Sequence, residues 1–335
     1  MNERQHGGHE SGSSRSIGGG AAGLGERELA EFAALRSALP SGIRFGTSSW
    51  NYPGWQGLVY RRSYGTRGAS GPMLEEYARF PLFGVVGLDA SYYAPTGEAT
   101  YRDYAVRLPP GYPVVSKVWQ QLTVHTWGRA QGPAKAGKRN PDFLNPELFL
   151  DAVYRPARRH FAEHQGPFVF ELQAVPRSAG VGPEGFARML DDFFAALPSD
   201  GRYAVELRNP EFLTPEYYAV LRAHRVAHVF NSWTRMPSIG EQLDLPGSLT
   251  APFVVARALM VPGRGYEETV DAFAPFDRIR EPAPEVRRDL VRLAVEAIAR
   301  TIPAFVLVNN RLEGCAPRTI EAVVREVLEV VGRSG

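Results

Sequence analysis

The sequence predicts a single eight-stranded (β/α) barrel of the TIM type. After residue 42, short apolar runs rich in β-branched residues alternate with amphipathic helical stretches, which is the pattern of parallel strands joined by helical crossovers. Eight such runs can be counted. Eight strands in strict alternation close into a barrel, whereas an open doubly wound sheet usually has fewer strands and a Gly-rich phosphate turn after its first strand. The first run is not followed by such a turn.

The chain begins with residues 1–25, which are rich in Gly, Ser and charged side chains. This segment is predicted to be a disordered tail, because it holds too little apolar surface to offset its ordering entropy. Residues 26–42 are predicted to form a helix and a linker. Apolar residues recur there at helical spacing, and Pro40 and Gly42 end the pattern. The barrel domain is predicted to occupy residues 43–331.

The elements of the barrel follow in order along the chain. The strands are predicted at residues 43–47, 85–89, 114–117, 168–172, 203–206, 227–230, 253–257 and 304–309. The helices between them are predicted at residues 73–80, 100–108, 146–164, 183–197, 215–224 and 284–301. The connections at 128–145 and 234–250 exceed the usual length, so each is predicted to be a lid or an insertion over one face.

Composition narrows the classes of function. The 38 basic and 36 acidic residues give a formal charge of +2, which provides no bulk attraction to nucleic acid or anionic lipid and leaves anion selectivity to local pockets. The single cysteine, Cys315, excludes an intrachain disulfide and a zinc site built from several thiolates. We find no membrane-spanning run, no secretory signal, no HExxH motif and no cofactor motif. A cytoplasmic protein that needs no cofactor, metal or membrane is expected.

Polar residues stand where the predicted strands end. The carboxyl ends of the strands carry the active site in a (β/α) barrel, so these side chains are the candidate site. They are, in chain order, Trp50, Tyr52, Asp89, Tyr92, Tyr93, Lys117, Glu171, Gln173, Glu206, Arg208, Asn231, Arg257, Asn309 and Asn310. Glu206 and Arg208 lie two residues apart on a strand and therefore share one face.

Three cations at separate strand ends, Lys117, Arg208 and Arg257, would repel one another unless carboxylates or a bound anion compensated them. Two arrangements remain open: a self-compensated network that includes Glu206, or a cationic cup for phosphate or carboxylate. Glu206 is the first candidate for a general acid or base, since fixed charges can tune its proton affinity. Its alternative role is a structural ion pair with Arg208.

Other candidates have two interpretations each. The aromatic residues near the first two strand ends form either a stacking wall for a sugar or base, or ordinary packing. His125 is either a proton shuttle or a surface loop residue. Cys315, just after the eighth strand, is either a nucleophile or a small buried residue at a helix start.

The segments FGTSSWNYPGWQGLVY, LDASYYAP, SKVWQQLTVH, YAVELRNPEF and VLVNNRLEGCAP, in that order, resemble the YecE-like family, also known as domain of unknown function 72. The resemblance covers residues 43–331. It implies a TIM-type barrel and places Lys117, His125, Glu206, Arg208, Arg257 and Asn309 around the bowl at the strand ends. The family is expected to carry a Glu where this sequence has Gly87 and an Asn where it has Asp89, so one carboxylate is expected to be missing.

Three hypotheses of function follow. The first is a cofactor-independent hydrolase or lyase for a small anionic or sugar-containing substrate, with Glu206, Lys117 and His125 as its catalytic side chains. The second is a non-catalytic protein that binds a metabolite, another anion or a nucleic-acid end in the same bowl. The third is a glycosidase that uses Glu171 and Glu206, which requires both carboxylates to face the bowl at a workable separation. The sequence leaves the oligomeric state open.

Overall fold

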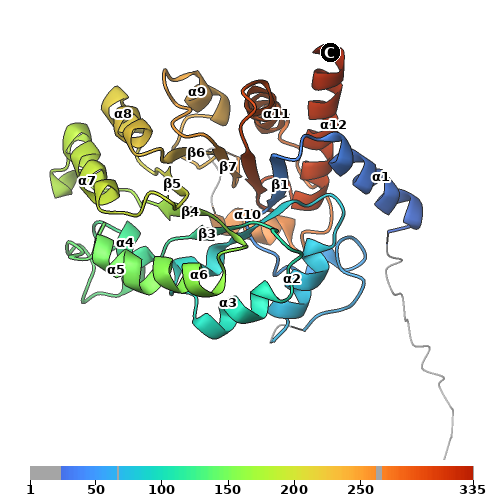
Figure 1. Cartoon of the computed structure of the whole chain (residues 1–335), viewed down its shortest axis with the longest axis horizontal. Helices are drawn as coiled ribbons and strands as arrows, with labels where there is room; N and C mark the ends of the chain where they lie inside the picture. Colours follow the sequence, from blue (N-terminus) through green and yellow to red (C-terminus); the bar gives the residue numbers. More distant parts are fainter. Residues whose placement is uncertain (1–23, 66–67, 262–265, 335) are drawn as a thin grey trace, which may run out of the picture.

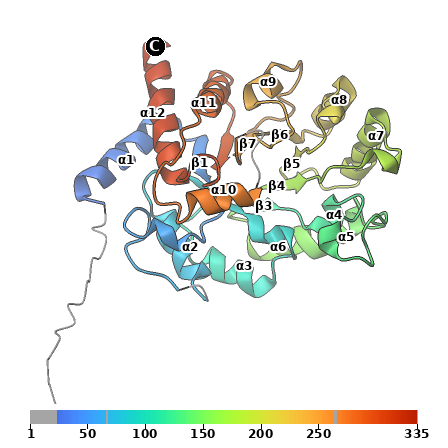
Figure 2. The same ribbon diagram turned by 180° about the vertical axis from the view of Figure 1, so that it is seen from behind.

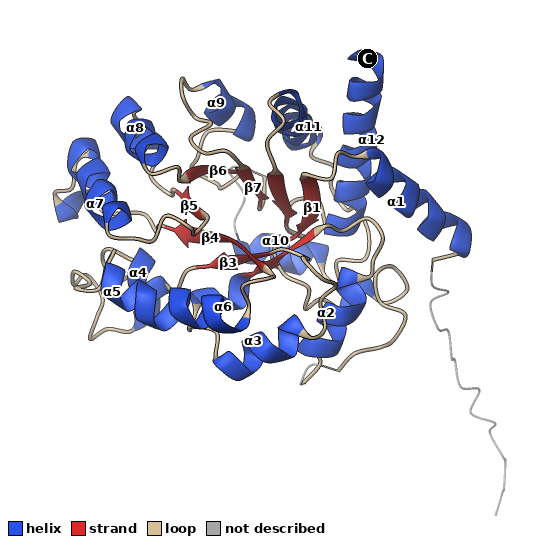
Figure 3. Ribbon diagram, in the orientation of Figure 1, coloured by secondary structure: helices blue, strands red, loops and turns tan. Residues whose placement is uncertain are grey.

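The computed structural model describes residues 24–65, 68–261 and 266–334 of the chain. Eight parallel strands close into a barrel in sequence order, β1 next to β2 and onward to β8, which pairs with β1 (Figure 3). The strands are β1 (Ile43–Thr47), β2 (Val85–Leu88), β3 (Val114–Lys117), β4 (Gln165–Glu171), β5 (Tyr203–Glu206), β6 (Ala227–Asn231), β7 (Val254–Ala258) and β8 (Ala304–Val308). The predicted TIM-type barrel is confirmed. Most of the predicted disordered tail lies outside the described residues.

Helices surround the strands on all sides (Figure 1). They are α1 (Glu26–Ala38), α2 (Ser70–Ala78), α3 (Glu98–Ala105), α4 (Gln120–Thr123), α5 (Pro146–Phe149), α6 (Arg155–His160), α7 (Pro183–Ala195), α8 (Pro215–Ala223), α9 (Ile239–Asp244), α10 (Tyr266–Phe273), α11 (Pro284–Ala299) and α12 (Ala316–Ser334). None of the described helices is both long enough and apolar enough to cross a membrane.

The helix predicted at 146–164 is interrupted by a π-helical turn, Leu150–Tyr154, between α5 and α6. Pro156 lies in the first turn of α6. A proline inside a helix has no N–H to donate and crowds the carbonyl four residues before it. A wider π-type turn relieves that crowding and lets the helix continue.

The connection at 234–250 is not a lid, so this part of the prediction was wrong. It contains α9, which takes its place in the ring of helices and packs against α11 and β6 (Figure 1). Ser238 and Glu241 form a capping box at its start, and the buried Gln242 side chain donates to the Asn231 carbonyl at 2.7 Å. The helix was missed because it is short and polar, and tertiary hydrogen bonds hold it.

The last helix, α12, was also absent from the predicted set. Ile320, Val323, Val324 and Val327 recur at helical spacing and are all buried, so the sequence did carry its signal. The N-terminal helix α1 packs beside α12 at the outside of the barrel (Figure 1), where Arg318 pairs with Glu28 at 2.7 Å.

The core has two parts. Between the strands and the helices lies a large apolar layer, and a second cluster fills the barrel itself: Val85, Val115, Val169, Ala204, Ala227, Val229, Phe253, Val255, Phe305 and Leu307. Strand side chains alternate between the two faces. On most strands, the next inward-facing residue, two positions closer to the carboxyl end, is polar. This periodicity places the candidate site above an apolar plug.

Helix α10 lies across one end of the barrel and is in front of the strands in Figure 2. It belongs to the segment between β7 and α11. The residues after it meet the loop that follows β1, because the rings of Phe276 and Tyr52 lie 5.7 Å apart, edge to face. This segment, rather than 234–250, approaches the mouth of the barrel.

Candidate functional site

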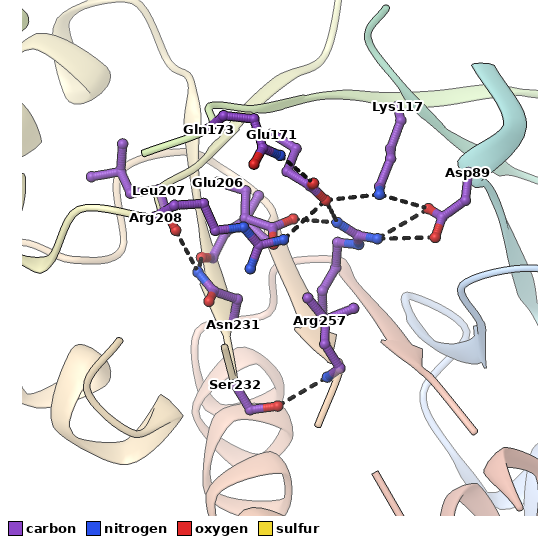
Figure 4. Close-up of polar contacts among 12 residues, drawn as sticks. Asp89, Lys117, Glu171, Gln173, Glu206, Leu207, Arg208, Asn231, Ser232 and Arg257 are labelled. Carbon is purple, nitrogen blue, oxygen red and sulfur yellow. Dashed lines mark hydrogen bonds and ion pairs between the residues drawn. The ribbon is translucent and has the colours of Figure 1, made fainter. Parts of the chain in front are cut away.

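Six charged side chains from strand ends meet at the carboxyl end of the barrel (Figure 4). We call them the bowl network: Asp89, Lys117, Glu171, Glu206, Arg208 and Arg257. Glu171 and Glu206 are paired in register on β4 and β5, and Arg257 is paired with Asn231 across β6 and β7. The register therefore brings residues far apart in sequence to one level of the barrel.

Arg257 lies at the centre of the bowl network. Its Nη1 donates to Glu171 Oε2 at 2.6 Å and also to Glu206 Oε2. Its Nη2 donates to both oxygens of Asp89, at 3.0 and 3.2 Å (Figure 4). One guanidinium thus binds three carboxylates, which suits its planar set of donors.

Glu171 joins the other two cations. Its Oε2 lies 2.8 Å from Lys117 Nζ and 3.0 Å from Arg208 Nη2, and its Oε1 accepts from Gln173 Nε2 at 3.0 Å. Burial acts to raise the pKa of Glu171, but the positive charges of Lys117, Arg208 and Arg257 outweigh it and hold that pKa well below its ordinary value. Glu171 is therefore ionised at neutral pH.

The Arg208 guanidinium has both satisfied and unsatisfied donors. Its Nη2 lies 2.7 Å from Glu206 Oε1, and its guanidinium carbon lies 4.0 Å from the centre of the Trp233 ring, a cation–π contact. Its Nη1 atom is buried and has no hydrogen-bond partner among the described residues. A buried donor without a partner costs about 1–3 kcal/mol, and such an atom marks a place where a ligand or water would bind.

Charge is balanced within the bowl network, because three cations face three carboxylates. Arg257 and Glu206 are almost completely buried, whereas Lys117 and Asp89 keep 13% and 26% of their side-chain surface exposed. Burial acts to lower the pKa of Arg257, but Glu206, Asp89 and Glu171 raise it overall. Of the two arrangements predicted, the self-compensated network is the one present in this structure.

Tyr92 and Tyr93 come after β2 in the chain and lie next to the bowl network. The Tyr92 ring lies 5.1 Å from Lys117 Nζ and packs edge to face with Tyr93 at 5.4 Å. Burial, followed by the negative charge of Glu171, raises the pKa of Tyr92. Tyr93 is 73% exposed, so an aromatic ring stands open to solvent beside the bowl.

Near the first strand, Trp50 and Tyr52 are placed as ordinary packing, which is the second of the two interpretations of these aromatic residues. Trp50 is buried, and its Nε1 donates to the Ser70 carbonyl at 2.8 Å. Tyr52 packs on Trp55 with ring centres 4.8 Å apart. These rings fill space between the β1 loop and its neighbours, because burying a large aromatic surface is favourable wherever the polar atom finds a partner.

Three predicted asparagines hydrogen-bond to the backbone, although Asn231 Oδ1 and Asn310 Nδ2 are buried and have no partner among the described residues. The Asn231 amide donates to the Leu207 and Val229 carbonyls at 3.4 Å each. Asn309 accepts from the Arg311 N–H at 3.0 Å, and Asn310 accepts from the Ala316 N–H at 2.8 Å, near the start of α12. Asn309 and Asn310 thus shape the turn after β8, and neither forms a hydrogen bond with a described residue of the bowl network.

His125 also forms no hydrogen bond or ion pair with a described residue of the bowl network. Its ring contacts Thr126 Oγ1 at 2.9 Å and packs edge to face with Phe143 at 5.1 Å. Burial, with a smaller effect of Arg139, lowers its pKa. Cys315 is buried, and burial raises its pKa to about 11, so this thiol is a poor nucleophile at neutral pH.

Two residues of the region escaped the sequence analysis. Trp233 supports Arg208, and its position two residues beyond the end of β6 was a usable signal. Glu313 is completely buried and binds Arg287 and Thr319. In the part of the chain that the structure describes, no group of three or more His, Cys, Asp or Glu residues could hold a metal ion.

The family described as "Protein of unknown function DUF72" matches residues 44–332. The chain belongs to this family. A DUF72 protein from Thermotoga maritima has a crystal structure with a TM-score of 0.56 to this chain and 16% identity, covering 87% of this chain and 99% of that one. A DUF72 protein from Enterococcus faecalis V583 has a TM-score of 0.55 and 15% identity, covering 87% and 95%. These likenesses show the fold. No curated protein matches the chain.

The YecE-like resemblance is therefore confirmed, since DUF72 is the same family. The structure also explains the departure at Gly87. A Cβ atom at Gly87 would lie 2.7 Å from the Ser48 carbonyl oxygen and 2.9 Å from its Cα, so any larger residue would displace the backbone after β1. Asp89, two residues further on the same inward face, binds Arg257 instead. The carboxylate expected to be missing has a counterpart in this DUF72 protein at position 89.

Proposed function

We propose that this DUF72 protein is a cofactor-independent enzyme, a hydrolase or lyase, that binds a small anionic substrate in the bowl at the carboxyl end of its barrel. The observation that carries the proposal is the bowl network, in which Lys117 and Asp89 keep exposed surface and Arg208 keeps an unpartnered donor. The proposal names a class of substrate and a class of chemistry.

Stability alone is a weak reason for such a network. Burying ionised groups costs several kcal/mol each, and well-packed apolar residues of similar size are often as stabilising as a buried ion pair or more so. The barrel interior just below is apolar, so the fold itself accepts apolar side chains there. Six charges gathered at the end where (β/α) barrels carry their sites support a role with a ligand.

The Lys117 and Arg208 side chains lie close together in the bowl. Lys117 Nζ and Arg208 Nη2 both contact the same Glu171 oxygen, at 2.8 and 3.0 Å, so one oxyanion group can reach both side chains. The Lys117 ammonium has three N–H donors. Asp89, at 3.7 Å from Nζ, lies beyond hydrogen-bond distance. A phosphate or carboxylate oxygen would therefore add to the network without first breaking the Glu171 contact.

The exposed side chains of the bowl network are our candidates for proton transfer. Glu206 has no exposed surface, and its two oxygens face Arg257 and Arg208. It suits the role of a positioning residue that fixes both arginines, which extends the predicted alternative of a structural ion pair with Arg208. Asp89 and Lys117 are the groups that a bound substrate can touch, so we assign proton transfer to this pair.

The glycosidase hypothesis has weaker support. Glu171 and Glu206 both face the bowl, and Arg208 Nη2 lies 3.0 Å from one carboxylate and 2.7 Å from the other, which is compatible with the separation of about 5 Å used in retaining enzymes. One of the two must be protonated to act as the acid. The pKa of Glu171 is held low, and Glu206 is closed off from a substrate by the arginines.

Thermal-shift measurements test the proposal, with a panel of phosphorylated metabolites and sugar acids on the wild type, Lys117→Met and Arg158→Met. Arg158, on α6, pairs with Asp200 at 2.9 Å and is a matched exposed control. We expect a ligand to raise the melting temperature of the wild type and of Arg158→Met but not of Lys117→Met. A ligand that stabilises all three proteins equally would refute binding in the bowl.

Turnover of that ligand is then compared in the wild type and Asp89→Asn. We expect product from the wild type and at least about 100-fold less from Asp89→Asn, the usual contribution of a positioned acid or base. Binding without any product would instead establish the non-catalytic alternative.

A further inference from the structure

Beyond the bowl, basic side chains gather on loops that follow the adjacent strands β3 to β6, four of them after β3 and one each after β4 and β6. These loops carry six exposed cations, which we call the basic arc: Arg129, Lys135, Lys138, Arg139, Arg177 and Arg235. The same loops hold two carboxylates outside the bowl network, Asp142 and Glu211, and these bond to the side-chain amides of Gln121 and Asn209. The arc is therefore strongly positive, although the whole chain is nearly neutral.

The cations of the basic arc differ in their pairing from other cations on the surface. Among the described residues, no carboxylate forms an ion pair with any of the six. Elsewhere on the surface, cations are commonly paired, as Arg155, Arg158 and Arg159 are on α6. Unpaired cations clustered on the end of the barrel that carries the bowl indicate an extended anionic partner.

Aromatic rings accompany these charges. Lys135 Nζ lies 5.0 Å from the centre of the Trp127 ring, and Arg208 lies over Trp233. Tyr93, beside the arc on the loop after β2, is 73% exposed and rests against Tyr92, whose ring contacts Lys117. Tyr93 thus offers an open ring face beside the cations, and such a face can stack on a base.

We infer that a single-stranded nucleic acid binds along the basic arc, with a base stacked on Tyr93 and its terminal phosphate in the bowl. Proteins that bind single strands combine a cationic track for the backbone with aromatic rings on which bases stack. A duplex would offer phosphates to the arc, but its paired bases could not stack on an exposed tyrosine. Only the placement of the terminal phosphate rests on the proposed function; the arc and Tyr93 are independent of it.

Fluorescence anisotropy tests this inference with a labelled single strand of about 12 nucleotides, within the usual site size, carrying or lacking a 5′-phosphate. The arc variant is Lys135→Gln with Lys138→Gln and Arg139→Gln. Its matched control replaces the three arginines of α6 in the same way, Arg155, Arg158 and Arg159. We expect the arc variant to bind at least about tenfold more weakly and its salt dependence to lose a slope of about 2, because three phosphate contacts are lost. The α6 control should bind as the wild type does.

Stacking is tested by Tyr93→Ala and Tyr93→Phe. Removing the ring should weaken binding by about tenfold, whereas phenylalanine should retain it, since the face of the ring makes the contact. Equal binding of a duplex or of heparin, with no effect of Tyr93→Ala, would show adsorption of polyanions only and overturn the inference. Unchanged binding by the arc variant would overturn it as well.

The 5′-phosphate arm separates this inference from the proposed function. We expect the wild type to prefer the phosphorylated strand and Lys117→Met to lose that preference. Arc-dependent binding with no such preference would leave the basic arc established and refute the placement of the end in the bowl.

Discussion

Arg257 shows at the scale of one residue why the bowl network is costly to disturb. Replacing Arg257 by Met would leave Glu171 and Glu206 buried with less positive charge, and breaking a buried pair on one side typically costs about 3–5 kcal/mol. We expect a loss of that size in the free energy of unfolding, measured with urea. Arg292→Met removes the exposed pair with Asp244 and should cost less than about 1 kcal/mol. Equal losses in the two variants would contradict the structural role of Arg257.

Gly87 shows the same sensitivity in the backbone. Its missing Cβ leaves room for the Ser48 carbonyl, so Gly87→Ala must shift the end of β1 or β2 and should destabilise the protein by about 1–3 kcal/mol. A Cβ at Gly185 on α7 would meet only Arg188 Nη2, at a comfortable 4.0 Å, and Gly185→Ala should instead stabilise by up to about 1 kcal/mol because alanine favours the helix. Urea unfolding of both variants measures the contrast. A neutral effect of Gly87→Ala would mean that the two strand ends are looser than the structure shows.

At the scale of elements, Glu313 ties the turn after β8 to two helices. Its carboxylate accepts from Arg287 Nε and Nη2 of α11 at 2.8 Å each, and from Thr319 Oγ1 of α12 at 2.7 Å. Glu313→Ala would leave these buried donors unpaired, so we expect a loss of about 3–5 kcal/mol in the free energy of unfolding. Glu296→Ala, which removes an exposed pair with Arg300, is the control and should change stability by less than about 1 kcal/mol. Anion binding in the bowl should survive in Glu313→Ala wherever the protein stays folded.

At the scale of the whole molecule, two buried groups set the response to acid. Burial lowers the pKa of His228 to about 4. Between its ordinary pKa of about 6.5 and that value, the unfolded chain binds a proton that the folded protein does not, so stability falls as the pH falls, by about 1.4 kcal/mol per pH unit. Glu171, whose pKa is lowered, adds a second loss below about pH 4.3, the ordinary pKa of a glutamate.

Urea unfolding from pH 7 to pH 4.5 checks the contribution of His228. The wild type should lose stability with falling pH more steeply than His228→Gln, which lacks the titrating ring. Parallel pH profiles for the two proteins would show that His228 is not buried in its neutral form.

The barrel was predictable because it rests on periodic features of the chain. Eight strands, their order and their alternation with helices follow from apolar runs that any parallel barrel must bury on both faces of each strand. The strand-end residues followed as well, because topology places all carboxyl ends together. In this way the sequence by itself determined the fold, the end of the molecule that carries the site, and a set of candidates that includes the six members of the bowl network.

Only the tertiary structure decided which of those residues meet. Trp50, Tyr52, His125, Asn309 and Asn310 also follow strand ends, yet each turns to a local partner, because the direction of a loop side chain depends on packing that no periodicity encodes. The short helix α9 depends on long-range hydrogen bonds. The close approach of the backbone at Gly87 leaves Asp89 as the carboxylate at the end of β2. Charge balance in the bowl network is likewise a sum over six side chains from five strand ends, and it exists only once the barrel closes.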